Sequence, residues 1–212
     1  MKTEALIRAL AADEVKRPPP LEHLVMGALA GGAAIAALLF AWKIGLRPDL
    51  LAAAHDFRVV LKFLVAGALA VSAAGLLLRL VHPGLSRGVW LLALLIGPAM
   101  LAIGIGYELT AFPPSDWGAR LVGRYSEYCL QSIPLLSAPI LVALLIVVRQ
   151  GAPTRPAIAG AVAGLLAGAI GAFIYAAHCP DDSPLFVLAW YGLAIAAVTV
   201  AGLLIGARVL RW

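Results

Sequence analysis

The sequence predicts an all-α membrane protein with six transmembrane helices, preceded by a short helix on the cytoplasmic side. Composition gives the first indication: of the 212 residues, 63% are hydrophobic and 13% are charged, whereas about a quarter of the residues of a soluble domain are charged. The apolar residues also form long runs. Because one crossing of a bilayer takes about 20 residues, six crossings leave room only for a tail and short loops, which excludes a separate soluble catalytic domain.

Charged residues and prolines divide the apolar residues into six runs. The expected spans are 24–44, 60–80, 88–108, 127–148, 157–177 and 185–207. The 23 residues before the first run are too many and too acidic for the start of a signal peptide, so we expect this helix to be retained as an anchor. We therefore divide the chain into a cytoplasmic segment, 1–23, and a membrane domain, 24–212.

Small residues and prolines predict how the helices pack. Glycines recur four residues apart in the first and fifth runs, at Gly27 and Gly31 and at Gly160, Gly164 and Gly168. Such faces let helix backbones approach closely. We expect contacts within one molecule, with a homodimer face as the alternative. Prolines inside the third and fourth runs, at Pro98, Pro134 and Pro139, are expected to kink those helices.

The distribution of lysine and arginine predicts the orientation. If the N-terminus is cytoplasmic, ten of the 16 basic residues lie on the cytoplasmic side and six on the other side. Cytoplasmic loops are enriched in these residues, so both termini are expected inside. The basic residues form no patch or basic helix face, which argues against nucleic-acid binding despite the net charge of +5.

The N-terminal segment is predicted to form a short amphipathic helix. Thr3 is a candidate N-cap, and Leu6, Ile7 and Leu10 form one apolar stripe before Arg17 and three prolines end the helix. The stripe could lie on lipid, but it is small, lacks aromatic residues and is accompanied by acidic residues. Docking in a partner's groove is the favoured interpretation.

Two cysteines are expected at the outer ends of adjacent antiparallel helices. Cys129 opens the fourth run and Cys179 follows the fifth, and the short connection between these helices brings the two residues near each other. A structural disulfide, a redox-sensing pair, a soft-metal site and inert buried thiols all remain open. The candidate further metal ligands are His178, Glu127, Asp181 and Asp182.

Two other functions are less favoured. No ionisable residue lies near the middle of a run, which argues against an ion-coupled transporter. A membrane thiol oxidoreductase would ordinarily need a second cysteine pair or a C-x-x-C motif, and the sequence has neither. The residues thus predict a binding protein without catalytic activity.

Several motifs together resemble the NrsF-type six-helix membrane anti-sigma factors over essentially the whole chain. They are the N-terminal Thr3, Leu6, Ile7 and Leu10 pattern followed by Arg17 and prolines, Cys-Leu-Gln-Ser-Ile-Pro at 129–134, the loop at 149–156, and the block from His178 to Gly192. Glu4 departs from the family's usual aspartate but keeps the negative charge near the helix start.

The resemblance implies a multi-pass protein of the bacterial inner membrane that holds an extracytoplasmic-function (ECF) sigma factor through its N-terminal segment. It also implies that Cys129 and Cys179 are needed for release under heavy-metal or oxidant stress. No cofactor is expected, apart from a soft metal ion at the cysteine pair as an open alternative. The expected partners are the sigma factor and membrane lipid, with a second copy of the chain as a further candidate.

Overall fold

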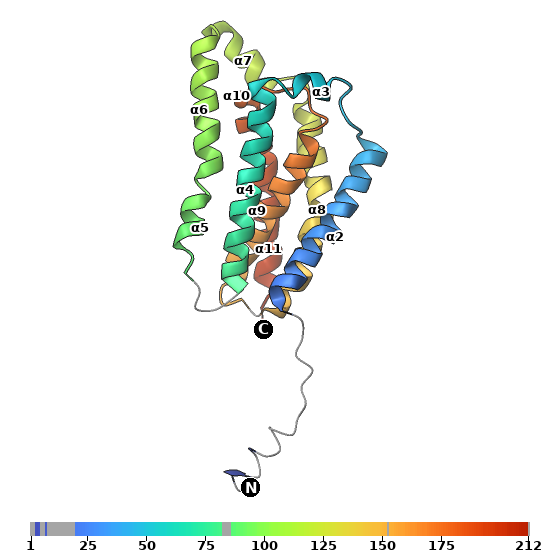
Figure 1. The fold of residues 1–212 in the computed structure, drawn as a ribbon, viewed down its shortest axis with the longest axis vertical. Helices are drawn as coiled ribbons and strands as arrows, with labels where there is room; N and C mark the ends of the chain where they lie inside the picture. Colours follow the sequence, from blue (N-terminus) through green and yellow to red (C-terminus); the bar gives the residue numbers. More distant parts are fainter. Residues whose placement is uncertain (1–2, 5–6, 8–19, 82–85, 152, 212) are drawn as a thin grey trace.

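The computed structural model describes residues 3–4, 7, 20–81, 86–151 and 153–211, and the fold is all-α (Figure 1). Among these residues, six helical segments are long and apolar enough to cross a membrane. They form an elongated bundle in which α2 begins and α11 ends at the same end (Figure 1). The predicted fold class is therefore confirmed.

The six spans agree with the predicted runs to within a few residues. Their bounds are Leu21–Lys43, Phe57–Val81, Gly88–Ala111, Ser126–Gln150, Pro156–Tyr175 and Pro184–Val209. The helices are α2 (Leu21–Lys43), α3 (Leu50–Ala53), α4 (Phe57–Val81), α5 (Gly88–Ala93), α6 (Ile96–Ala111), α7 (Pro114–Val122), α8 (Ser126–Gln150), α9 (Pro156–Tyr175), α10 (Pro184–Phe186) and α11 (Gly192–Val209), with a π-helical segment η1 (Val187–Tyr191) before α11.

Helix α9 forms the centre of the bundle and packs closely on α11. A Cβ atom placed on Gly160 would lie 2.2 Å from the carbonyl oxygen of Gly202, and one on Gly164 would lie 2.5 Å from that of Val198. Glycine is required at these positions because the two backbones are in contact. The predicted intramolecular packing of the fifth run is thus confirmed.

The small-residue face predicted for the first span is wrong by one residue. A Cβ atom on Gly27 or Gly31 would meet nothing within 4 Å, whereas one on Gly32 would lie 2.7 Å from the Cα of Ile140 in α8. Consecutive positions on a helix point about 100° apart. The close contact between α2 and α8 therefore uses the neighbouring face of α2.

The third span is peripheral and divided. Its two parts, α5 and α6, meet at Leu94 and Leu95. Pro98 supplies no N–H for the carbonyl of Leu94, and its ring would clash with that carbonyl in a regular helix, so the predicted effect of this proline is confirmed. Pro134 and Pro139, in contrast, lie inside the continuous helix α8.

The N-terminal segment is described at three positions only. Thr3, Glu4 and Ile7 are helical, and Ile7 is exposed. The other residues predicted to bind a partner, Leu6, Leu10 and Arg17, lie outside the described residues. The stripe as a whole therefore stays a prediction.

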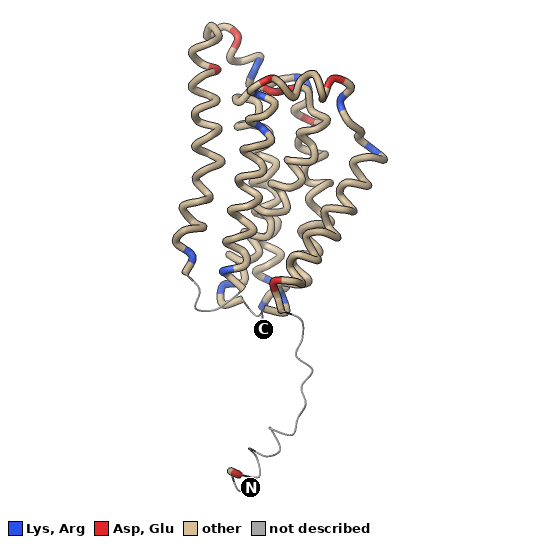
Figure 2. The backbone as a smooth tube through the Cα atoms, in the orientation of Figure 1, with Lys and Arg blue, Asp and Glu red and all other residues tan. Residues whose placement is uncertain are grey.

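Charged residues gather at the two ends of the bundle, and its middle is apolar in the described part of the chain (Figure 2). At the end opposite to the start of α2, Lys62 in α4 and Glu108 in α6 are fully buried. We call this end the outer end. The functional site described below lies here.

Candidate functional site

The two cysteines meet inside the outer end of the bundle. Cys129 lies in the first turn of α8 and Cys179 lies four residues beyond the end of α9; both are free thiols, and neither is exposed to solvent. Their side chains are within hydrogen-bonding contact of each other. The predicted apposition of the two residues is therefore present in the fold.

The surroundings of Cys179 favour its ionised form. The hydrogen bond with Cys129 and the nearby positive charge of Lys62 lower the pKa of the Cys179 thiol, although burial acts in the opposite direction. A thiolate is the reactive form of cysteine. The ammonium group of Lys62, which contacts the backbone of Cys179, therefore favours the thiolate at this residue.

Aromatic side chains enclose the thiol pair. The rings of Tyr175 and Tyr191 lie 6.0 Å apart, and the ring of His178 lies 5.8 Å from that of Tyr175. Both tyrosines are buried, and neither hydroxyl has a nitrogen or oxygen hydrogen-bond partner among the described residues. The sulfur atoms thus lie in a compact, largely apolar compartment.

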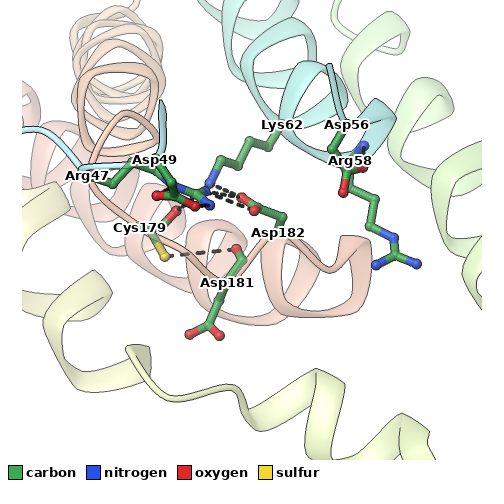
Figure 3. Close-up of polar contacts among 8 residues, drawn as sticks. All are labelled: Arg47, Asp49, Asp56, Arg58, Lys62, Cys179, Asp181 and Asp182. Atoms are coloured by element: carbon green, nitrogen blue, oxygen red, sulfur yellow. Dashed lines mark hydrogen bonds and ion pairs between the residues drawn. The ribbon is translucent and has the colours of Figure 1, made fainter. Parts of the chain in front are cut away.

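A network of charged residues holds the Cys179 segment from the other side (Figure 3). The ammonium group of Lys62 forms an ion pair with Asp182 and donates a 2.6 Å hydrogen bond to the carbonyl oxygen of Cys179. Arg47 donates to both oxygens of Asp182, at 2.9 and 3.1 Å. Buried charges need such partners, so each member depends on the others for its position.

Arg47 also forms a two-point ion pair with Asp49. Its Nε and Nη2 atoms each lie 2.8 Å from a carboxylate oxygen of that residue. The hydrogen bond with Arg47 lowers the pKa of Asp49 to about 2, and the same contact raises the pKa of Arg47 above its ordinary value. Arg47 therefore stays charged while it contacts the Cys179 segment.

Asp181 ties the same segment to the start of α8. Its Oδ2 atom accepts hydrogen bonds from the backbone N–H groups of Arg124 and Tyr125, at 2.9 and 2.8 Å. Tyr125 immediately precedes α8. A carboxylate at this position satisfies backbone donors and interacts favourably with the helix dipole, and it aligns Cys129 with Cys179.

The predicted additional metal ligands do not converge on the thiols. His178 Nδ1 lies 3.0 Å from the carbonyl oxygen of Gly45, the carboxylates of Asp181 and Asp182 are engaged as described above, and Glu127 is exposed. Within the described ranges, no group of three His, Cys, Asp or Glu residues is arranged to hold a metal ion. In this structure His178, Asp181 and Asp182 thus hold the loop in place through these contacts.

A second buried charge lies at the same end. Glu108 is fully buried and pairs with Arg120 at 2.9 Å and with Arg58 at 3.1 Å. Both guanidinium groups lie over the ring of Phe112, at 4.8 Å for Arg58 and 3.3 Å for Arg120. This cluster fastens the peripheral third span to α4 and α7.

A polar hollow opens beside the Cys179 segment. It has a volume of about 690 Å³. Its lining includes Arg58, Arg120, Arg124, Asp181 and Asp182. Water-soluble molecules can approach the loop that carries Cys179 through this hollow, whereas the thiols themselves lie behind it.

The sequence did not indicate the roles of Arg47, Lys62 and Asp49 in this site. Lys62 alone could have been recognised from the sequence, because it is a lysine inside the predicted span 60–80, near the end of that span that is expected to face outward. A lysine in an apolar span is rare and needs a partner. Its carboxylate partner, 120 residues away, carries no comparable signal.

The comparisons with known proteins agree with the motifs. Residues 10–212 match the family NrsF, described as "Negative regulator of sigma F". The chain belongs to the NrsF family. It is 34% identical over 216 residues to the anti-sigma-F factor NrsF of Caulobacter vibrioides (strain NA1000 / CB15N), and the match covers the whole of both chains.

A second relative gives the same result. The probable anti-sigma-F factor NrsF of Azospira oryzae (strain ATCC BAA-33 / DSM 13638 / PS) is 35% identical over 215 residues, again across both whole chains. No solved structure matches the chain. The NrsF family comprises regulators, so the chain is a regulator and not an enzyme, and the oxidoreductase alternative is set aside.

Proposed function

We propose that this NrsF-family chain is a bacterial inner-membrane anti-sigma factor that binds an ECF sigma factor through residues 1–23 and releases it when the cysteine pair reacts. The observation that supports it most directly is the match over whole chains to two proteins named as anti-sigma-F factors. The polar N-terminal segment, with its stripe of Leu6, Ile7 and Leu10, is the part of the chain suited to docking in a groove.

The proposed topology places both termini in the cytoplasm. In the described part of the chain, six basic residues lie at the terminal end and six at the outer end, and four more precede the first span in the sequence. Four of the six at the outer end, namely Arg47, Arg58, Lys62 and Arg120, form ion pairs with Asp49, Asp182 or Glu108. The outer end therefore carries few unpaired positive charges, which is in keeping with the preference for cytoplasmic lysine and arginine.

The proposed trigger is a reaction of Cys129 and Cys179. A two-electron oxidant would remove two protons and two electrons from the pair, so that two S–H bonds break and one S–S bond forms. A soft metal ion would instead displace the two protons and bind both sulfurs. The contact between the thiols, the lowered pKa of Cys179 and the adjacent polar hollow support this role.

Replacing both cysteines by serine tests the trigger. We expect the double variant to accumulate in the membrane, to keep the sigma factor repressed, and to fail to induce a sigma-dependent reporter with cadmium or diamide. Diamide supplies the oxidising equivalents and cadmium the soft cation, so the two reagents separate the two chemistries. A stable variant that is still fully inducible would contradict the trigger.

A structural crosslink is the competing role, and the same variant distinguishes it. Loss of a structural disulfide costs about 2–4 kcal/mol, which would lower the membrane level of the double variant and release the sigma factor without stress. Co-purification of the tagged wild-type chain with a sigma factor tests the anti-sigma activity independently of either role. Recovery of the chain without a sigma factor from unstressed cells would count against it.

A further inference from the structure

The outer end of α2 is fastened to the Cys179 segment. Helix α2 ends at Lys43, and Gly45, with a φ of 77°, turns the chain back toward the bundle. The backbone N–H of Arg47 then donates to the carbonyl oxygen of Ala177 at 3.1 Å, and its Nη1 atom donates to that of Cys179 at 3.3 Å. Together with the contact between His178 and Gly45, these bonds join α2 to the thiol-bearing loop.

Apart from this turn, the outer end of α2 is held by the buried Phe40 and by the half-buried Ile44, which packs against the core. Figure 1 shows that α2 diverges from α8 toward its outer end. Trp42, Lys43 and Leu46 are exposed. Consequently, a change in the position of the Cys179 carbonyl is transmitted to α2 chiefly through Arg47 and its immediate neighbours.

A close backbone contact of α2 with α8 lies at the midpoint of α2. Gly32 is eleven residues from each end of the helix, which corresponds to about 16 Å of helix on either side. Here its backbone abuts Pro139 and Ile140 of α8. A rigid helix that approaches its neighbour this closely at its centre can tilt about that point, so a shift of the outer end moves the inner end by a similar distance in the opposite direction.

The inner end of α2 leads directly into the N-terminal segment. Val25 is buried, and the side chain of Leu21 covers Gly151 at the end of α8. Residues 1–20 precede this point in the chain. Helix α2 is therefore the shortest covalent connection between the outer end and the segment proposed to bind the sigma factor.

From these contacts we propose that α2 carries the signal across the membrane as a lever, and that Arg47 is the positioning residue that couples it to the Cys179 segment. The inference rests on the proposed function. The structure, with both thiols free, has the Arg47 contacts in place and corresponds to the repressing state. Loss of these contacts is expected to release the lever without any reaction at the cysteines.

The test replaces Arg47 and follows two readouts in the full-length protein. Arg47→Gln removes the charge and the ion pairs, and Arg47→Lys keeps the charge but not the multiple hydrogen bonds. Lys43→Gln, which removes an exposed charge at the same end of α2, is the matched control. A sigma-dependent reporter measures release in unstressed cells. Alkylation of Cys129 and Cys179 by N-ethylmaleimide in native membranes measures whether the thiols remain buried.

We expect Arg47→Gln to raise the unstressed reporter to within about twofold of the induced wild-type level, while thiol alkylation stays within about twofold of the wild-type rate. Arg47→Lys should give an intermediate reporter level, and Lys43→Gln should stay repressed. A variant Arg47→Gln that remains repressed would overturn the proposal. Reporter release accompanied by fast alkylation would also overturn it, because the effect would then be local unfolding of the site.

A serine background separates this inference from the proposed trigger. With Cys129 and Cys179 both replaced by serine, Arg47→Gln should still release the reporter, since the lever acts downstream of the thiols. The serine variant with Arg47 intact tests the trigger itself, by its response to cadmium or diamide. If the trigger is wrong, the Arg47→Gln result still tests the lever, and the reverse also holds. Continued repression by Arg47→Gln in the serine background would contradict the lever.

Discussion

Lys62 donates a hydrogen bond of 2.6 Å to the carbonyl oxygen of Cys179, which lies 117 residues further along the chain. The lysine belongs to a membrane-spanning helix and is fully buried, so its charge needs the carboxylate of Asp182 as well as this carbonyl. One buried ammonium group thereby fixes both the backbone of Cys179 and a charge three residues later. The position of the thiol depends on this arrangement.

Lys62→Met should therefore lower the stability of the bundle in detergent by about 1–3 kcal/mol, since a buried polar group left without its partner costs about that much. Asp182 keeps Arg47, which limits the loss. Thermal unfolding monitored by circular dichroism gives the measurement. Lys43→Met, at an exposed position, is the control, and equal stability of the two variants would show that the Lys62 contacts contribute little.

The crossing of α9 and α11 allows a second prediction about stability. Gly164→Leu should strongly reduce the membrane level and thermal stability, because its Cβ alone would lie 2.5 Å from the backbone of α11. Gly27→Leu should have little effect, since nothing lies within 4 Å of that position. Comparable levels of both variants would contradict the packing described for α9.

Much of the fold could be predicted because bilayer thickness fixes the length of an apolar run. The break before Pro98 was also predictable, since proline removes a specific helical hydrogen bond. It was not predictable that Gly32, and not Gly27 or Gly31, makes the close contact with α8. Glycine spacing identifies faces that permit close approach, but which face meets a neighbour depends on how the whole helix is rotated in the bundle.

The site was predictable only in part. Two antiparallel helices joined by a short loop place Cys129 and Cys179 at one end, and the structure has them in contact. The ion network was missed because Arg47 and Lys62 lie more than a hundred residues from Asp182. The partners of the possible metal ligands were not predictable for a related reason: His178, Asp181 and Asp182 are close in sequence but contact different groups in the structure.

The topology can be tested with a membrane-impermeant maleimide on intact spheroplasts. Because both native cysteines are buried, the test uses single cysteines in the chain that lacks them. Asp56→Cys at the exposed outer end should be labelled, whereas Ser86→Cys and Thr154→Cys should be labelled only after lysis. The reverse pattern would invert the proposed orientation and remove the outer location of the thiol pair.

The docking stripe predicts a gain of expression without stress. Replacing both Leu6 and Leu10 by aspartate should free the sigma factor and induce its reporter, since an unpaired buried carboxylate costs several kcal/mol. Membrane levels should not change, because both residues precede the first span. Glu4→Gln is a control that alters charge and leaves the stripe intact. Full repression by the double variant would rule out this docking role.

The environment of Cys179 predicts the pH dependence of its reactivity. Because the hydrogen bond with Cys129 and the charge of Lys62 lower the pKa of Cys179, its thiolate forms at lower pH than that of an ordinary cysteine, which has a pKa of about 8.5. The rate of alkylation, measured in purified protein with a chelator present and located by mass spectrometry, should therefore reach its half-maximum below that pH. Cys129→Ala removes the hydrogen-bond donor and Lys62→Met removes the positive charge, so each should move the midpoint upward, whereas Arg58→Met should leave it in place. An unchanged midpoint in both test variants would mean that neither neighbour controls the ionisation of Cys179.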